Sequence, residues 1–96
     1  MTGLLDGRLA LITGAGSGIG EAIAHAMARA GARIVAVDIN GVAAERTAAA
    51  IGRAAASFTC DVTDRGRCDG LAGDIRSGIG AISILVNNAA SSAAGR

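Results

Sequence analysis

The chain is poor in aromatic residues. It contains no tryptophan, no tyrosine and one phenylalanine, although 51% of its 96 residues are apolar. The core must therefore consist of alanine, valine, isoleucine and leucine. Lysine is also absent, since all nine basic residues are arginines, and the net charge is only +1. No run of like charge and no cluster of basic and aromatic residues occurs, so we expect no nucleic-acid partner.

Cysteine and long apolar runs are scarce as well. Cys60 and Cys68 stand eight residues apart, without a CxxC pair or a histidine cluster, which argues against a metal site and a disulfide framework. We interpret them as reduced, structural thiols. No apolar run reaches the roughly 18 residues of a membrane span, and no basic region followed by an apolar run opens the chain. We therefore expect no membrane partner and a cytoplasmic protein.

The most informative stretch is the glycine-rich segment 13–20, TGAGSGIG. The apolar run over 9–12 predicts a buried strand over 8–12 before it, and a helical pattern over 18–30 follows it. Glycine permits positive φ and close approach of a ligand, and the first N–H groups of a helix favour an anion. Strand, glycine loop and helix together form a phosphate-binding layout, suited to a pyrophosphate. The alternative is an ordinary tight turn.

The helix over 18–30 carries one apolar stripe, which we expect to pack on the sheet. Gly31 is expected to end this helix as a C-cap. The single histidine, His25, lies off the stripe, so we expect it on a solvated face. The stripe consists of Ile19, Ala22, Ile23, Ala26, Met27 and Ala30.

A second buried strand is expected over 33–37, and it leads directly into Asp38. A carboxylate about 20 residues beyond the glycine loop is placed to accept hydrogen bonds from ribose hydroxyls. The alternative role for this residue is a helix N-cap. Asn40 can cap the next helix, expected over 42–51, which would leave Asp38 free for the ribose.

A third strand is expected over 55–60, just before Asp61. Like Asp38, Asp61 could bind a ligand at the end of its strand or cap the next helix. Thr63 is itself a good N-cap for the third helix, so Asp61 is not needed for capping. Three glycines weaken that helix by about 1 kcal/mol each, so packing must hold it. A fourth buried strand, over 82–86, leads into Asn87, Asn88, Ala89 and Ala90.

These features resemble the short-chain dehydrogenase/reductase family. The family's TGxxxGxG spacing fits Thr13 to Gly20. The general dinucleotide fingerprint GxGxxG does not fit, because Ile19 occupies the position of its third glycine. Segment 87–90 resembles the family's NNAG motif, with Ala90 in place of glycine. The resemblance implies an α/β, Rossmann-type doubly wound parallel sheet, truncated to about four strands in the order 3-2-1-4 with about three helices.

The resemblance also implies a dinucleotide site at the switch point between the first and fourth strands. Asp61 and Val62 would contact adenine. NAD is expected in preference to NADP, because Asp38 would repel the extra phosphate and no basic residue stands at positions 17, 39 or 40. The implied cofactor-binding residues are Gly14, Ser17, Gly18, Ile19, Gly20, Asp38, Asp61, Val62, Asn88, Ala89 and Ala90.

Catalysis in this family uses a tyrosine, a lysine four residues later and a serine. The chain has neither tyrosine nor lysine, and arginine cannot relay the proton because its pKa stays above about 12. Ser91 and Ser92 come too early for the family serine. We expect no catalytic residue here, only the NAD(H)-binding part of an oxidoreductase acting on an alcohol/ketone pair. The alternative is a non-catalytic NAD-binding or regulatory module.

The expected organisation is a single Rossmann half-domain over 1–96, ordered over 1–90 and disordered over 91–96. A doubly wound dinucleotide fold uses about six strands, so the chain reads as a fragment whose full-length form takes a small alcohol or ketone substrate. Its apolar fourth strand would lie at the edge of the sheet. Because such an edge invites association, we expect a homo-oligomer.

Overall fold

The computed structural model describes residues 3–88, which form one parallel sheet in the order β3-β2-β1-β4. Its strands are β1 (Leu9–Thr13), β2 (Arg33–Asp38), β3 (Ala55–Thr59) and β4 (Ile84–Val86). The connecting helices are α1 (Gly18–Arg29), α2 (Gly41–Ile51) and α3 (Arg65–Gly78). Strand order, parallel direction and helix number confirm the truncated Rossmann-type sheet that the sequence predicts.

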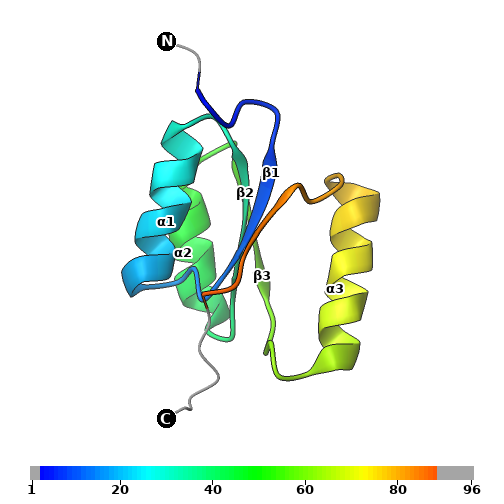
Figure 1. The fold of residues 1–96 in the computed structure, drawn as a ribbon. Coiled ribbons are helices and arrows are strands. Elements are labelled where there is room, and N and C mark those ends of the chain that lie inside the picture. Colours follow the sequence, from blue (N-terminus) through cyan, green and yellow to red (C-terminus); the bar gives the residue numbers. More distant parts are fainter. Residues whose placement is uncertain (1–2, 89–96) are drawn as a thin grey trace.

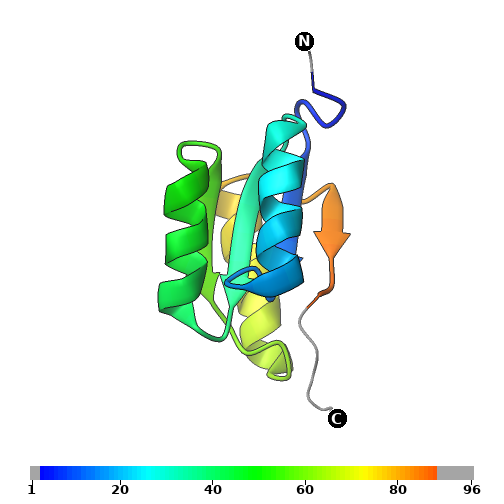
Figure 2. The same cartoon turned by 90° about the vertical axis from the view of Figure 1, so that its left-hand side faces the viewer.

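The sheet lies between two helical layers, with α1 and α2 on one face and α3 on the other (Figures 1 and 2). The two central strands, β1 and β2, are buried on both faces, which explains their continuous apolar sequences. Successive side chains of these strands point to opposite faces of the sheet, so they pack against different helical layers. Ala10, Ile12, Ile34 and Ala36 join the core beneath α1 and α2, whereas Leu9, Leu11, Val35 and Val37 join the core beneath α3.

The ends of the helices follow the expected capping chemistry, with one exception. Gly31 has a φ of 103° and, with Ala32, returns hydrogen bonds to the last turn of α1. Asn40 caps α2 by accepting from the Ala43 amide at 3.1 Å. The expectation for Thr63 is wrong: Asp64 caps α3, accepting from the Arg67 amide at 3.1 Å. Neighbouring residues with equally suitable side chains compete there, and helix geometry selects one.

The buried face of α1 is rotated relative to the predicted stripe. Ile23 and Met27 pack on the core as expected, but Ala24 is fully buried and Ile19 is 72% exposed. Ala22 and Ala26 are exposed as well. The reason lies at Gly20, whose missing Cβ lets the helix start pack against the glycine loop and turns that side inward. His25 is half-buried and not fully solvated.

Strand β4 forms the edge of the sheet next to β1, over residues 84–86 only. The sequence predicts a start at residue 82, but Ser83 is held differently: its amide donates to the Leu9 carbonyl at 2.9 Å, and its hydroxyl accepts from the Leu9 amide. Ile84 and Val86 pack toward α1, whereas Leu85 is 66% exposed on the α3 side. Within residues 3–88, this strand has a neighbour on one side only.

Candidate functional site

The carboxyl ends of all four strands meet at one edge of the sheet, drawn at the bottom in Figures 1 and 2. The glycine loop follows β1, Asp38 ends β2, Asp61 follows β3, and Asn88 follows β4. The chain leaves β1 toward β2 in one direction and returns to β4 on its other side. Ligands of doubly wound sheets bind at such a reversal, and the sequence-predicted residues that the structure describes lie at this edge.

The glycine loop depends on its glycines in two distinct ways. Gly14 and Gly18 have φ values of 65° and 59°, which residues with a side chain rarely adopt. Gly16 and Gly20 are needed for close packing. A Cβ on Gly16 would lie 2.6 Å from the Ala43 Cβ, and one on Gly20 would collide with the Gly14 carbonyl and lie 2.6 Å from the Asn88 amide nitrogen. The sequence motif missed this role for Gly16, which the TGxxxGxG spacing leaves unassigned.

The start of α1 presents donors at this edge. Ser17 is the N-cap, yet its hydroxyl makes no capping hydrogen bond, and the first intrahelical bond is donated by the Glu21 amide to the Ser17 carbonyl at 3.4 Å. The N–H groups of residues 18–20 precede that bond. Ser17, Gly18 and Ile19 are exposed. This terminus can therefore receive an anion.

Asp38 fastens the glycine loop to the end of β2. Its Oδ2 accepts from the Gly16 amide at 2.8 Å, and its Oδ1 accepts from the Asn40 amide at 2.9 Å. The expectation that Asn40 caps α2 is confirmed, but Asp38 is not free as that reasoning inferred. A carboxylate offers about four lone pairs, so each oxygen can accept one further hydrogen bond.

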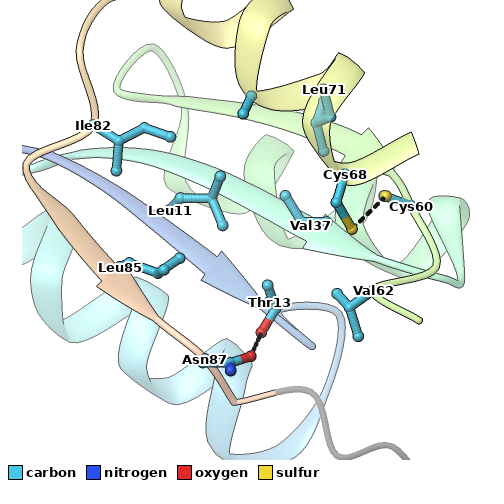
Figure 3. Close-up of a pocket in the computed structure, with 11 residues that line it drawn as sticks. Leu11, Thr13, Val37, Cys60, Val62, Cys68, Leu71, Ile82, Leu85 and Asn87 are labelled. Atoms are coloured by element: carbon cyan, nitrogen blue, oxygen red, sulfur yellow. Dashed lines mark hydrogen bonds between the residues drawn. The ribbon is translucent and has the colours of Figure 1, made fainter. Parts of the chain in front are cut away.

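Asp61 holds the turn between β3 and α3. Its Oδ1 accepts from both the amide and the hydroxyl of Thr63, at 2.9 and 2.7 Å. These two bonds stabilise the ionised form and lower the pKa of Asp61 below its ordinary range. Val62 lines a hollow beside this turn (Figure 3). The sequence identified Asp61 correctly as dispensable for capping α3, but gave no sign of its bonds to Thr63.

The segment after β4 is bound to the glycine loop. The Asn88 side-chain amide donates to the Gly14 carbonyl at 3.3 Å, and the Thr13 hydroxyl donates to the Asn87 side-chain oxygen at 3.3 Å. The pairing of Thr13 with Asn87 was missed, although both residues belong to the motifs. Ala89 and Ala90, also predicted to contact the cofactor, lie outside the described residues.

Thr47 is a supporting residue that the sequence did not indicate. It is fully buried in α2, and its hydroxyl donates to the Ala15 carbonyl in the glycine loop at 2.9 Å. In an alanine-rich helix a single threonine carries no pattern that would mark it. The loop is thus held by β2, α2 and the segment after β4.

An apolar hollow of about 330 Å³ lies beside the site on the α3 face of the sheet (Figure 3). Leu11, Leu71, Ile82 and Leu85 supply its apolar walls, with Thr13 and Asn87 at one end. Among residues 3–88, no three histidine, cysteine or acidic side chains lie close enough together to hold a metal ion. The helices of this part of the chain are too short or too polar to cross a membrane.

Comparison with known sequences gives a consistent picture. The family model described as short chain dehydrogenase matches residues 8–96. The sorbitol dehydrogenase of Cereibacter sphaeroides is 51% identical over 86 residues, which are 90% of this chain and 34% of that protein. The D-threitol dehydrogenase of Mycolicibacterium smegmatis is 50% identical over 88 residues, which are 88% of this chain and 34% of the relative.

Solved structures share the fold. A structure titled ribose-5-phosphate isomerase from Brucella melitensis matches with a TM-score of 0.87 and 34% identity, over 94% of this chain and 34% of that one. A 3-ketoacyl-(acyl-carrier-protein) reductase from the same organism, complexed with NADH, matches with a TM-score of 0.81 and 42% identity, over 84% of this chain and 34% of the reductase chain. One fold serves different reactions, so these likenesses leave the substrate open.

The chain spans about a third of the length of the curated relatives it matches. The family match, in contrast, covers nearly all of its residues, including the glycine loop and every carboxyl-edge residue described above. Identity near one half over this span agrees with the fold and with the motif spacing. The chain belongs to the short-chain dehydrogenase/reductase family.

Proposed function

We propose that this chain binds NAD as the cofactor-binding part of an oxidoreductase that acts on an alcohol/ketone pair. One observation carries the proposal: the amides that open α1 lie at the same carboxyl edge as the Asp38 carboxylate, which is bound to the preceding glycine loop by the 2.8 Å bond from the Gly16 amide. An anion-binding helix start next to a ribose-binding carboxylate matches the pyrophosphate and the adjoining ribose of an adenosine diphosphate. The NADH bound to the related reductase supports this assignment.

Each part of the dinucleotide has residues to hold it. The loop and the first turn of α1, residues 14–20, would bind the pyrophosphate, and Asp38 the adenosine ribose. Asp61 and Val62 would contact the adenine, together with Ile39, which is 67% exposed directly after Asp38. Asn88, with Ala89 and Ala90, would lie toward the nicotinamide. NAD itself supplies the hydride acceptor; these residues bind and orient it.

NAD should bind more tightly than NADP because, with the ribose held by Asp38, the 2′-phosphate of NADP would come next to this carboxylate. Two unit charges about 4 Å apart in an effective dielectric near 20 repel by roughly 4 kcal/mol, an upper guide because water and salt screen them. Even a third of this energy is about tenfold in affinity. The neighbouring positions, Ser17, Ile39 and Asn40, provide no positive charge to offset it.

The substrate that we propose is a small polyhydroxylated alcohol or its ketone. Two relatives with about half of their aligned residues identical act, by their names, on sorbitol and D-threitol. Catalysis would come from residues that these 96 do not contain, since tyrosine and lysine are absent. That absence also favours a second candidate, NAD binding without catalysis. For either, the chain by itself should transfer no hydride between NAD and a polyol, and turnover above a blank without protein would contradict this.

The test is a set of calorimetric titrations of NAD and NADP into the wild type, Asp38→Asn and Glu45→Gln. Glu45 is an exposed carboxylate on α2, so its variant controls for the loss of one negative charge elsewhere. We expect the wild type and Glu45→Gln to prefer NAD by about tenfold, and Asp38→Asn to lose most of that preference. Equal binding of both cofactors by the wild type, or an unchanged preference in Asp38→Asn, would refute the role of Asp38.

A further inference from the structure

The two cysteines form a pair that the proposed function does not use. Cys60 follows β3, Cys68 lies in the first turn of α3, and their Sγ atoms are 3.8 Å apart and face each other (Figure 3). Both Sγ atoms also lie 3.7 Å from the Asp61 carbonyl oxygen. Both thiols are free in this structure. The spacing along the sequence gave no sign of this contact, because the turn of residues 61–67 folds back between the two cysteines.

We propose that Cys60 and Cys68 are a modification site, at which a small-molecule disulfide such as glutathione disulfide oxidises the pair to an intramolecular disulfide. A sulfur–sulfur bond is about 2.05 Å long, so the two Sγ atoms must approach by roughly 1.8 Å. We infer that a shift of α3 supplies this approach, because Ile75 is its one buried residue and the helix contains glycine at positions 66, 70 and 73.

The two thiols differ in access. Cys60 is 5% exposed, and burial, together with the neighbouring Cys68, raises the pKa of its thiol. Both thiols line the hollow of about 330 Å³, but Cys68 is only half-buried and is therefore the more accessible of the two. The oxidant therefore meets Cys68 first, and Cys60 completes the reaction from inside.

The reaction proceeds in two exchanges. The Cys68 thiolate attacks one sulfur of glutathione disulfide, so a mixed disulfide forms as the glutathione S–S bond breaks and one glutathione thiolate leaves. Cys60 then loses its proton to solvent and attacks the Cys68 Sγ, which forms the protein disulfide and releases the second glutathione. The two cysteines together lose two electrons and two protons, and glutathione disulfide gains both to become two thiols.

The surrounding polar groups tolerate this loss of two S–H donors. The Asp61 carbonyl oxygen still accepts from the Asp64 amide at 3.0 Å, so oxidation leaves it with a partner. The new bond closes a loop over residues 60–68 and restricts the unfolded chain. We therefore expect the oxidised form to melt at a higher temperature. The bond also restrains the turn that carries Asp61 and Val62, but the proposal does not depend on cofactor binding.

The test is oxidation in glutathione buffers of graded ratio, followed by alkylation of free thiols and intact-mass analysis. We expect the wild type to become a monomer lighter by two hydrogen atoms, with no alkylated cysteine and no bound glutathione. Cys60→Ser is expected to stop at a glutathione adduct on Cys68. Oxidised wild type should melt above its reduced form, whereas the melting temperature of Cys60→Ser should not rise on oxidation.

Two results would overturn the proposal. One is accumulation of glutathione adducts or disulfide-linked dimers of the wild type, with no internal disulfide in native buffer. The other is an internal disulfide that forms only in urea, because the native contact between the two sulfurs would then be irrelevant. A Cys68→Ser variant, in which Cys60 remains unmodified in native buffer, checks that Cys68 reacts first.

Discussion

Replacing Thr47 by valine tests whether the glycine loop is held by α2. Thr47 is fully buried, and its hydroxyl donates to the Ala15 carbonyl, which belongs to an equally buried residue. Valine has nearly the same shape, so Thr47→Val removes the hydroxyl donor without leaving a cavity. The Ala15 carbonyl then loses the donor that reaches it from α2.

The size of the effect follows from that geometry. A hydrogen bond contributes a net of about 0.5–1.5 kcal/mol, and a buried acceptor left unsatisfied costs about 1–3 kcal/mol. The extra methyl of valine returns part of this, so we expect a loss of about 2 kcal/mol in the free energy of unfolding. For a domain of this size that corresponds to a fall of roughly 10 °C in melting temperature.

Thr47→Ser is the matched control, because it keeps the hydroxyl and removes one methyl, at a cost of about 1 kcal/mol. Urea unfolding should therefore rank wild type above Thr47→Ser, and Thr47→Ser above Thr47→Val, with equal m values. NAD affinity should fall most in Thr47→Val. If Thr47→Val is as stable as Thr47→Ser or more so, the hydrogen bond does not hold the loop.

Three further substitutions, with Gly70→Ala in α3 as a control, test contacts at the carboxyl edge of the sheet and at its edge strand β4. Gly20→Ala should weaken NAD binding by tenfold or more in calorimetry. Gly70→Ala is the control: a Cβ there meets no atom within 4 Å, so the variant should stabilise α3 by about 1 kcal/mol without weakening NAD binding. Equal NAD affinities of the two variants would contradict the packing argument. Thr63→Val should raise the pKa of Asp61 toward its ordinary value in an NMR titration. Because the pKa of Asp61 is lower in the folded state, the ionised carboxylate stabilises the fold fully above its unfolded-state pKa. This stabilisation is lost as the pH falls through the folded-state pKa. Leu85→Lys should reduce self-association of the chain in light scattering; unchanged association would exclude β4 as its origin.

The sequence was a sound guide to the elements themselves. Buried parallel strands have continuous apolar sequences, and Gly31 marked the end of α1, so the order of elements could be predicted. Strand β4 is shorter than its apolar run, because Ser83 makes side-chain hydrogen bonds to Leu9. Apolar character alone does not show where regular pairing begins.

The site was harder to predict where function and support share one residue. The motif identified Asp38, but its bonds to the Gly16 and Asn40 amides depend on how the loop folds back over β2. The buried stripe of α1 was misplaced because the approach at Gly20 sets the rotation of the helix, and hydrophobicity does not encode it. Both errors arise from contacts between segments, which a local pattern cannot contain.

The way the glycine loop is fastened has a consequence for the order of folding. Its anchors come from later parts of the chain: the Val37 carbonyl, which accepts from the Ala15 amide, the Asp38 carboxylate, the Thr47 hydroxyl and the Asn88 amide. Asn88 lies 74 residues from its partner, so the loop acquires its full set of contacts only after β4 has joined the sheet. During synthesis, the glycine loop is therefore made early but completes its contacts late. A dinucleotide that binds this loop selects chains in which β4 has docked and, at a hundred times its Kd, stabilises them by about 2.7 kcal/mol.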